Sequence, residues 1–230
     1  MIINKVTFTG ADNSTSVEEL LSIQKEYPFV EWGILIASNP GRNRYPSNDY
    51  IMSLKDKNLN LALHLCSIHS KGIMTDGIID IKYDFFDRYQ INFNFKHSSH
   101  DLANYGKLIN KFPNKKFILQ ANASNESYIN TILEEINPKN TNILFDSSGG
   151  RGTEIKLIKD PYKNIYTGYS GGLNPDNVNE ICNLIIEHKS EDKVWIDIES
   201  GVRTDDIFDL NKVRSVLKTV KSCMNRGFIL

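Results

Sequence analysis

Short apolar segments alternate with longer amphipathic ones along the whole chain, and this alternation limits the possible folds more than any other feature. Eight segments have the length and the apolar or alternating pattern of strands in a parallel sheet. A helical pattern lies after each of them, as expected when every strand is followed by a helix that covers the sheet. The predicted strands are 5–10, 29–36, 59–66, 90–96, 115–122, 141–146, 164–171 and 193–200.

The predicted helices complete eight βα units. They are expected over 16–27, 47–56, 76–88, 101–112, 125–136, 154–159, 174–189 and 209–224. No linker or low-complexity tract interrupts the 230 residues, so we expect one domain that covers 1–230. This pattern and length fit an α/β fold of the (β/α)₈ TIM barrel type. An open doubly wound sheet is the alternative, because alternation alone does not distinguish a closed sheet from an open one.

Charge and cysteine content limit the partners and the location. The 27 basic and 28 acidic residues nearly cancel, which argues against nucleic acid as a partner. The three cysteines are widely spaced and fit neither a disulfide framework nor a paired zinc motif, and we expect neither a metal nor another cofactor. No signal-like start and no 18-residue apolar run occur, so we expect no membrane contact and a cytoplasmic location. We also expect a monomer or a homodimer.

Polar residues gather toward the carboxyl ends of the predicted strands at a spacing of two. Because alternate residues of a strand share one face, this spacing places the polar groups together and leaves the apolar positions for the helix-covered face. Barrel enzymes build their sites at this end of the strands. The polar positions are Thr7 and Thr9, His64 and Cys66, Asn92, Asn94 and Lys96, Gln120 and Asn122, Asp146, and Asp197 and Glu199.

Glycine-bearing turns follow the last three predicted strands, at 146–152, 169–175 and 199–204. Glycine lets the main chain approach a ligand closely, so that successive N–H groups can converge on phosphate oxygens. The common phosphate site of barrels lies after strands seven and eight. We therefore expect a phosphorylated small molecule as the ligand.

These loops resemble those of the phosphoribosylanthranilate isomerase family, which are barrel enzymes that perform an Amadori rearrangement. The similar stretches are NRYPS (43–47), ILFDSSGGRG (143–152), SGGLNPDNV (170–178) and WIDIESGVRT (195–204). The resemblance implies a (β/α)₈ barrel and an isomerase that acts on a phosphorylated sugar-type substrate.

The resemblance also implies roles for particular residues. Asp146 would be the general acid, Arg44 would bind a substrate carboxylate, and Asp197 would orient the substrate. Gln120, near the carboxyl end of its predicted strand, and Lys96, at the end of its own, are expected to contact the substrate as well. The residues that would hold the ribose phosphate are Gly150, Gly171, Gly172, Ser200 and Gly201.

The first strand departs from the family at a catalytic position. The family's general base is a cysteine, whereas this chain has Thr9 there. A threonine hydroxyl has too high a pKa to remove a carbon-bound proton without a partner base. Cys66, His64 and Asp12 are the candidates for a relocated base of an Amadori or aldose/ketose isomerase. Glu199, where the family commonly has serine, is a further departure.

Two other functions fit the same phosphate site. Lys96 could form a Schiff base or stabilise a carbanion, which would make the protein an aldolase or lyase. A barrel without its base could also persist as a non-catalytic phospholigand-binding protein. Arg44, Arg151 and Arg203 fit every one of these functions, because guanidinium groups bind both carboxylate and phosphate.

Overall fold

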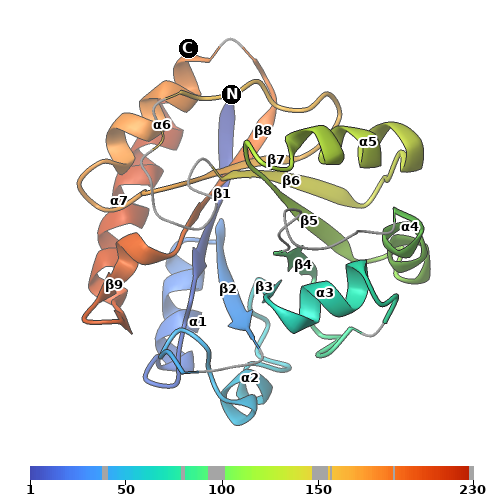
Figure 1. Ribbon diagram of the computed structural model, residues 1–230. Helices are drawn as coiled ribbons and strands as arrows, with labels where there is room; N and C mark the ends of the chain where they lie inside the picture. The colour runs from blue at the N-terminus through green and yellow to red at the C-terminus, as the bar shows by residue number, and fades with distance from the viewer. Residues whose placement is uncertain are drawn as a thin grey trace.

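The computed structural model describes residues 1–37, 41–78, 81–92, 102–146, 155, 157–188 and 190–227. Within them eight parallel strands form one closed barrel, in which each strand pairs with the next along the chain and the last pairs with the first. Figure 1 shows the strands around the centre and the helices outside them. The predicted (β/α)₈ barrel is thus confirmed, and the open sheet is excluded. The strands are β1 (Ile2–Thr9), β2 (Val30–Ile36), β3 (Leu61–Leu65), β4 (Arg88–Ile91), β5 (Lys116–Ala121), β6 (Thr141–Asp146), β7 (Thr167–Ser170) and β8 (Lys193–Ile198).

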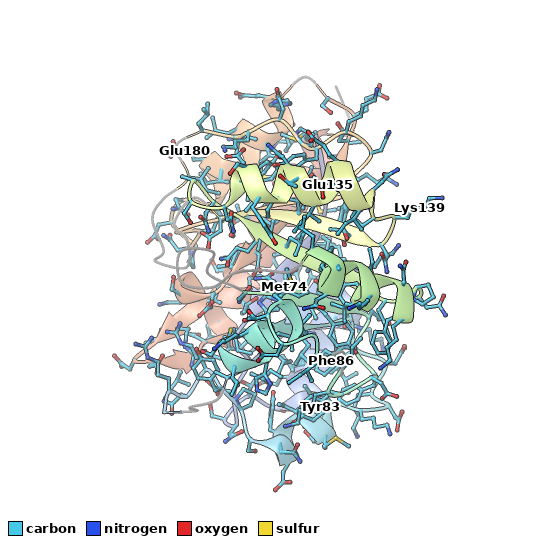
Figure 2. All side chains as sticks on the ribbon, turned by 45° about the vertical axis from the view of Figure 1, so that its right-hand side comes forward. Met74, Tyr83, Phe86, Glu135, Lys139 and Glu180 are labelled. Atoms are coloured by element: carbon cyan, nitrogen blue, oxygen red, sulfur yellow. The ribbon has the colours of Figure 1, made fainter. Side chains whose placement is uncertain are left out.

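Helices cover the outside of the barrel. A 3₁₀ turn, η1 (Ser200–Val202), and a hairpin of β9 (Arg203–Thr204) and β10 (Ile207–Phe208) separate β8 from the last helix. Charged side chains such as Glu135 and Lys139 are exposed on this outer layer (Figure 2). The helices are α1 (Val17–Glu26), α2 (Asn48–Ser53), α3 (Ile68–Met74), α4 (Leu102–Lys111), α5 (Glu126–Ile136), α6 (Val178–Glu187) and α7 (Leu210–Gly227). In the part of the chain that the structure describes, no helix is long and apolar enough to cross a bilayer.

Local sequence explains where the first helix begins. The Ser16 hydroxyl accepts a hydrogen bond from the Glu19 amide at 3.3 Å, which satisfies one of the free N–H groups of the first turn. Glu18 and Glu19 also place negative charge near the positive end of the helix dipole. α1 then buries Leu20 and Ile23 against the barrel, as an amphipathic surface helix does.

The helix predicted over 76–88 is wrong. The helix of this βα unit is α3, which ends at Met74, and the chain then forms turns before β4. Gly77 and Tyr83 have φ angles of 65° and 62°, in the left-handed region that an α-helix excludes. Phe86 is buried in the core from this irregular segment.

The helix predicted over 154–159 is also not observed where it can be checked. Residues 155 and 157–159 are not helical, and 154 and 156 lie outside the described residues. The predicted strand 90–96 begins earlier than expected, with β4 at Arg88, and residues 93–96 lie outside the described residues.

Strand register places alternate side chains inside the barrel. Asp146 is in register with Ser170, and Ser170 with Asp197, so these three residues lie side by side on β6, β7 and β8. One layer below, Leu144 and Trp195 belong to a small apolar cluster inside the barrel, separate from the large core under the helices. The inner face therefore changes from apolar to polar toward the carboxyl ends of these strands.

A buried ion-pair layer fills the amino-terminal part of the interior. Glu31 accepts hydrogen bonds from Arg88 at 2.7 Å, Lys5 at 2.9 Å and Thr7 at 2.8 Å. The Arg88 guanidinium also lies over the Trp195 ring, 4.3 Å from its centroid. Burial alone would raise the pKa of Glu31, but the charges of Arg88 and Lys5 outweigh burial and lower it, so the group is an anion.

Candidate active site

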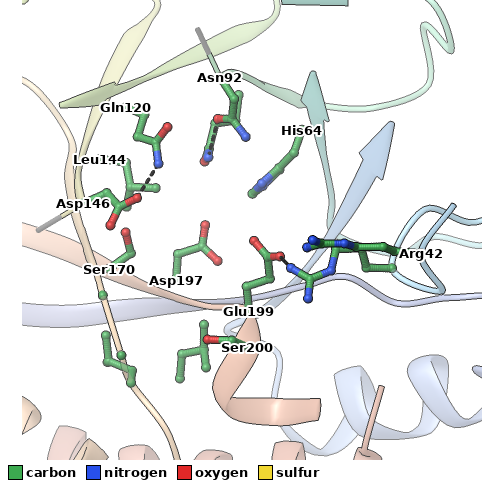
Figure 3. Close-up of a pocket in the computed structure, with 16 residues that line it drawn as sticks. Arg42, His64, Asn92, Gln120, Leu144, Asp146, Ser170, Asp197, Glu199 and Ser200 are labelled. Atoms are coloured by element: carbon green, nitrogen blue, oxygen red, sulfur yellow. Dashed lines mark hydrogen bonds and ion pairs between the residues drawn. The ribbon is translucent and has the colours of Figure 1, made fainter. Parts of the chain in front are cut away.

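A cavity of about 470 Å³ opens at the carboxyl ends of the strands. Most of its lining side chains are polar, and they come from strands and loops around the whole barrel (Figure 3). The lining residues are Arg42, Arg44, His64, Gln90, Asn92, Gln120, Leu144, Asp146, Ser170, Gly171, Gly172, Leu173, Asp197, Ile198, Glu199 and Ser200.

Three carboxylates enter this cavity from neighbouring elements. Asp146 ends β6, Asp197 lies on β8, and Glu199 follows β8 at the start of η1. Figure 3 shows all three side chains directed into the same space. Gln120 on β5 donates a hydrogen bond from Nε2 to Oδ2 of Asp146 and thereby orients that carboxyl group. Such a group of acids can donate and accept protons on one bound molecule.

Asp197 is buried and has one oriented partner. Its side chain accepts a hydrogen bond on Oδ1 from the Thr9 hydroxyl at 2.7 Å. Gly33 makes room for this hydroxyl, because a Cβ atom at position 33 would lie 2.4 Å from Thr9 Oγ1. Burial raises the pKa of Asp197 to about 8, and the hydrogen bond from Thr9 opposes this rise. The group therefore titrates near neutral pH.

His64 and Cys66 share β3 and its end, but their environments differ. His64 lines the cavity, and burial lowers its pKa to about 3, so its imidazole is neutral at neutral pH. Its Nε2 atom has no partner among the described residues and can hydrogen-bond a ligand. Cys66 is not one of the lining residues; it accepts a hydrogen bond from Asn92 at 3.4 Å, and burial raises its pKa to about 11.

The two glycine turns after β7 and β8 touch each other. Gly171 and Gly172 have φ angles of 128° and 63°, which only glycine adopts without strain. A Cβ atom on Gly201 would lie 1.9 Å from the carbonyl oxygen of Leu173, so only glycine lets the second turn pack on the first. Gly171, Gly172 and Ser200 line the cavity, whereas Gly201 is the point of contact behind them.

Asparagine side chains fix the shape of the first glycine turn. Asn174 and Asn177 both donate to the carbonyl oxygen of Gly172, at 3.1 Å and 3.0 Å. Asn177 is also the N-cap residue of α6, so this helix begins at Val178, four residues later than the predicted start at Asn174. With its carbonyl held away, the turn can present N–H groups to an anion.

Two of the three arginines predicted to bind anions, Arg44 and Arg203, have partners within the protein. Arg44 lines the cavity but pairs with Glu199 and, at 3.4 Å, with Asp206. Arg203 is buried against Asp12 at 2.8 Å and ties the turn after β8 to the loop after β1, so its role is structural. Asp12, one of the bases considered above, is thereby held as an ion-paired carboxylate outside the principal cavity.

Some predicted residues cannot be placed, and some residues of the cavity were not predicted. Lys96, Gly150 and Arg151 lie outside the described residues. The cavity also contains Arg42 and Gln90, which the sequence analysis did not select. The predicted strand 90–96 placed Gln90 at its amino end, whereas β4 ends at Ile91, so Gln90 lies near the carboxyl end of the strand. Among the described residues no cluster of three or more His, Cys, Asp or Glu side chains could hold a metal ion.

The closed parallel ring and the polar cavity at its carboxyl-terminal face define the class: a (β/α)₈ barrel with the site geometry of barrel enzymes. A family model described as N-(5'phosphoribosyl)anthranilate (PRA) isomerase matches residues 97–219, which is more than half of the chain. The protein therefore belongs to the PRA isomerase family, as the resemblance of its loops predicted.

Solved structures agree with this family and show the shared fold. PRA isomerase from Pyrococcus furiosus is 18% identical with a TM-score of 0.60, and the match covers 95% of this chain and 98% of that chain. A monomeric form of the dimeric enzyme from Thermotoga maritima is 18% identical with a TM-score of 0.61, covering 96% and 99%. A PRA isomerase in complex with reduced 1-(o-carboxyphenylamino)-1-deoxyribulose 5-phosphate (rCdRP) is 16% identical with a TM-score of 0.58, covering 96% and 100%.

Proposed function

We propose that this protein is an isomerase that converts a phosphorylated aminoaldose, PRA or a close analogue, into the corresponding aminoketose. One observation carries the proposal: a strand-end carboxyl group, Asp146, lines the same cavity as Gly171, Gly172 and Ser200 of the two paired glycine turns. The turns offer main-chain N–H groups to the substrate phosphate, and this anchors the sugar with its reactive carbons near the carboxylates.

Asp146 acts as the acid that opens the sugar ring. Its proton passes to the ring oxygen while the bond between that oxygen and C1 breaks, and the lone pair of the substrate nitrogen forms a C=N bond. Gln120 keeps the Asp146 carboxyl group directed into the cavity. His64, a neutral group at the cavity wall, can hydrogen-bond a sugar hydroxyl without adding charge. A base must then remove the proton from C2.

Turnover of PRA tests the proposal directly. The unaltered protein is expected to consume PRA, as followed by the change in anthranilate fluorescence, and to form the aminoketose phosphate. Calorimetric titration with rCdRP gives the affinity of the site independently of turnover. Binding of rCdRP without turnover would instead favour a non-catalytic phospholigand-binding protein, and trapping of a substrate on Lys96 by borohydride would favour the lyase. The monomeric or homodimeric state and the cytoplasmic location stay predictions.

A second candidate function is isomerisation of an aldose or ketose phosphate that carries no carboxylate. The ion pair between Arg44 and Glu199 favours it, because Glu199 occupies the guanidinium group that a substrate carboxylate would need. Arg42 lies beside this pair at the rim of the cavity and could serve a carboxylate instead (Figure 3).

Replacement of Glu199 by serine separates the two substrates. If PRA is the substrate, Glu199→Ser should lower the KM for PRA by about tenfold, because the substrate carboxylate no longer competes with a protein carboxylate for Arg44. KM and kcat measured with PRA and with simple pentose phosphates check this. Glu180→Ser, at an exposed position on α6, is the matched control. An unchanged KM for PRA together with turnover of a pentose phosphate would favour the second function.

A further inference from the structure

We propose that Asp197 is the base that removes the carbon-bound proton from the substrate, and that Thr9 positions it. The inference rests on the proposed isomerase function and assigns the step that Thr9 cannot perform by itself. It follows from the arrangement of β1, β2 and β8 around one buried carboxyl group.

The geometry gives Asp197 both access and a fixed orientation. Its side chain lines the cavity although it is only 7% exposed, so solvent does not surround it. The hydrogen bond from Thr9 at 2.7 Å occupies Oδ1 and leaves Oδ2 for a ligand. Register places Asp197 beside Ser170 and two strands from Asp146, so an acid and a base lie on the same wall of the cavity.

The three bases considered from the sequence are less suited to this step. Cys66 does not line the cavity and stays a protonated thiol. His64 lines it, but a desolvated imidazole with a lowered pKa is a weak base. Asp12 is held by Arg203 in another part of the loop region. Asp197 differs from His64 in that its pKa is raised, and a carboxylate with a raised pKa is a stronger base than an ordinary one.

Burial and the neighbouring groups together determine where Asp197 titrates. Burial has the largest effect and raises its pKa to about 8; the Thr9 hydrogen bond lowers it, while Glu199 and Glu31 raise it and Arg88 lowers it. Other titratable groups face the same cavity from neighbouring elements and complete the surroundings. They are Asp146 on β6, His64 on β3, and Arg42 and Arg44 in the loop after β2.

The proposed step conserves atoms and electrons. The Asp197 carboxylate takes the proton from C2 of the ring-opened iminium, and the C–H electron pair forms the C1=C2 bond. The π electrons of the C=N bond pass to nitrogen and neutralise it. The resulting enolamine tautomerises when its hydroxyl proton is lost and C1 gains a proton, so C2 is oxidised to the ketone while C1 is reduced. No external oxidant or reductant is required.

Three variants test the proposal. Asp197→Asn retains the shape and can still accept the Thr9 hydrogen bond, but it cannot take up a proton. Thr9→Val removes the hydroxyl with little change of shape, and Thr9→Ser restores it. We measure kcat and kcat/KM for PRA between pH 5.5 and 9.5 (the range brackets the pKa of about 8), the affinity for rCdRP, and the melting temperature of each protein.

The expected results distinguish a base from a structural carboxylate. Asp197→Asn should lower kcat at least about 100-fold while the affinity for rCdRP changes less than about threefold. It should also raise the melting temperature at pH 7. The folded-state pKa lies above the ordinary value of 3.8, so the native group costs stability between pH 3.8 and about pH 8. In the unaltered protein kcat/KM should rise with pH, with a midpoint near pH 8, and level off above it. Thr9→Val should move this rise about 0.5 to 1 pH unit higher, and Thr9→Ser should reverse the move.

Two kinds of result overturn the inference. Turnover of PRA that survives in Asp197→Asn within tenfold, or a pH profile that Thr9→Val leaves in place, overturns the assignment of Asp197 and leaves the isomerase function intact. An unaltered protein that binds rCdRP but converts no PRA overturns the proposed function and the assignment of Asp197 together.

Discussion

Asp146→Asn is expected to lower kcat for PRA by about a thousand-fold, within the range that loss of a general acid produces. Asparagine has nearly the same shape and can accept the hydrogen bond that Gln120 now donates to the carboxylate. It has no acidic proton to give to the ring oxygen, so the loss falls on the chemical step. Because the phosphate is held by other residues, the affinity for rCdRP should change less than about threefold.

Steady-state kinetics and calorimetry check this prediction together. Asp76→Asn, at an exposed position after α3, is the matched control and should behave like the unaltered protein. Equal activity of Asp146→Asn would remove Asp146 from the mechanism. A parallel loss of kcat and of rCdRP affinity would mean that Asp146 binds the substrate rather than protonating it.

Glu31→Leu is expected to lower the free energy of unfolding by about 3–5 kcal/mol. The substitution leaves Arg88 charged and buried in the barrel interior without the carboxylate that now accepts its hydrogen bond at 2.7 Å. Removal of one partner of a buried pair costs more than the pair contributes, because the remaining charge loses its compensation. Urea denaturation at pH 7 measures the difference.

An exposed pair and the pH dependence provide the controls. Glu26→Leu breaks the exposed pair with Arg214, whose closest atoms are 3.7 Å apart, and should cost less than about 1 kcal/mol. The pKa of Glu31 is lowered in the folded protein, so its contribution to stability is present above its ordinary pKa of 4.5 and is lost as pH falls through the folded-state pKa. The penalty of Glu31→Leu should therefore shrink below about pH 4.5. A penalty no larger than that of Glu26→Leu would contradict the prediction.

The barrel could be predicted because its strands have a local signature. Each predicted strand is a short run with an apolar or alternating pattern. Six of the eight predicted helices lie close to observed ones, as with α1 and α5. The segment between β3 and β4 was not predicted correctly, because its apolar residues reach the core from turns with left-handed backbone at Gly77 and Tyr83. Periodicity describes regular elements and carries no information about such turns.

The candidate site was predictable in its positions but not in its pairings. Strand parity selected Thr9 and Asp197 as inward-facing residues. These residues are 188 positions apart in the chain, and their hydrogen bond depends on the relative height of β1 and β8 in the barrel. The pairing of Arg44 with Glu199 also joins distant loops. Sequence shows which residue types are present, whereas only the closed ring shows which of them neutralise each other.

The contact between Gly201 and Leu173 has a consequence for how this barrel is completed. These residues belong to the last two βα units, and the turn after β8 packs at Gly201 directly on the main chain of the turn after β7. An anion held between them would therefore stabilise the final quarter of the chain as one cooperative block, by an amount that increases with the concentration of ligand over its dissociation constant. Such a ligand would thereby stabilise the pairing of β8 with β1, which closes the ring between the two ends of the chain.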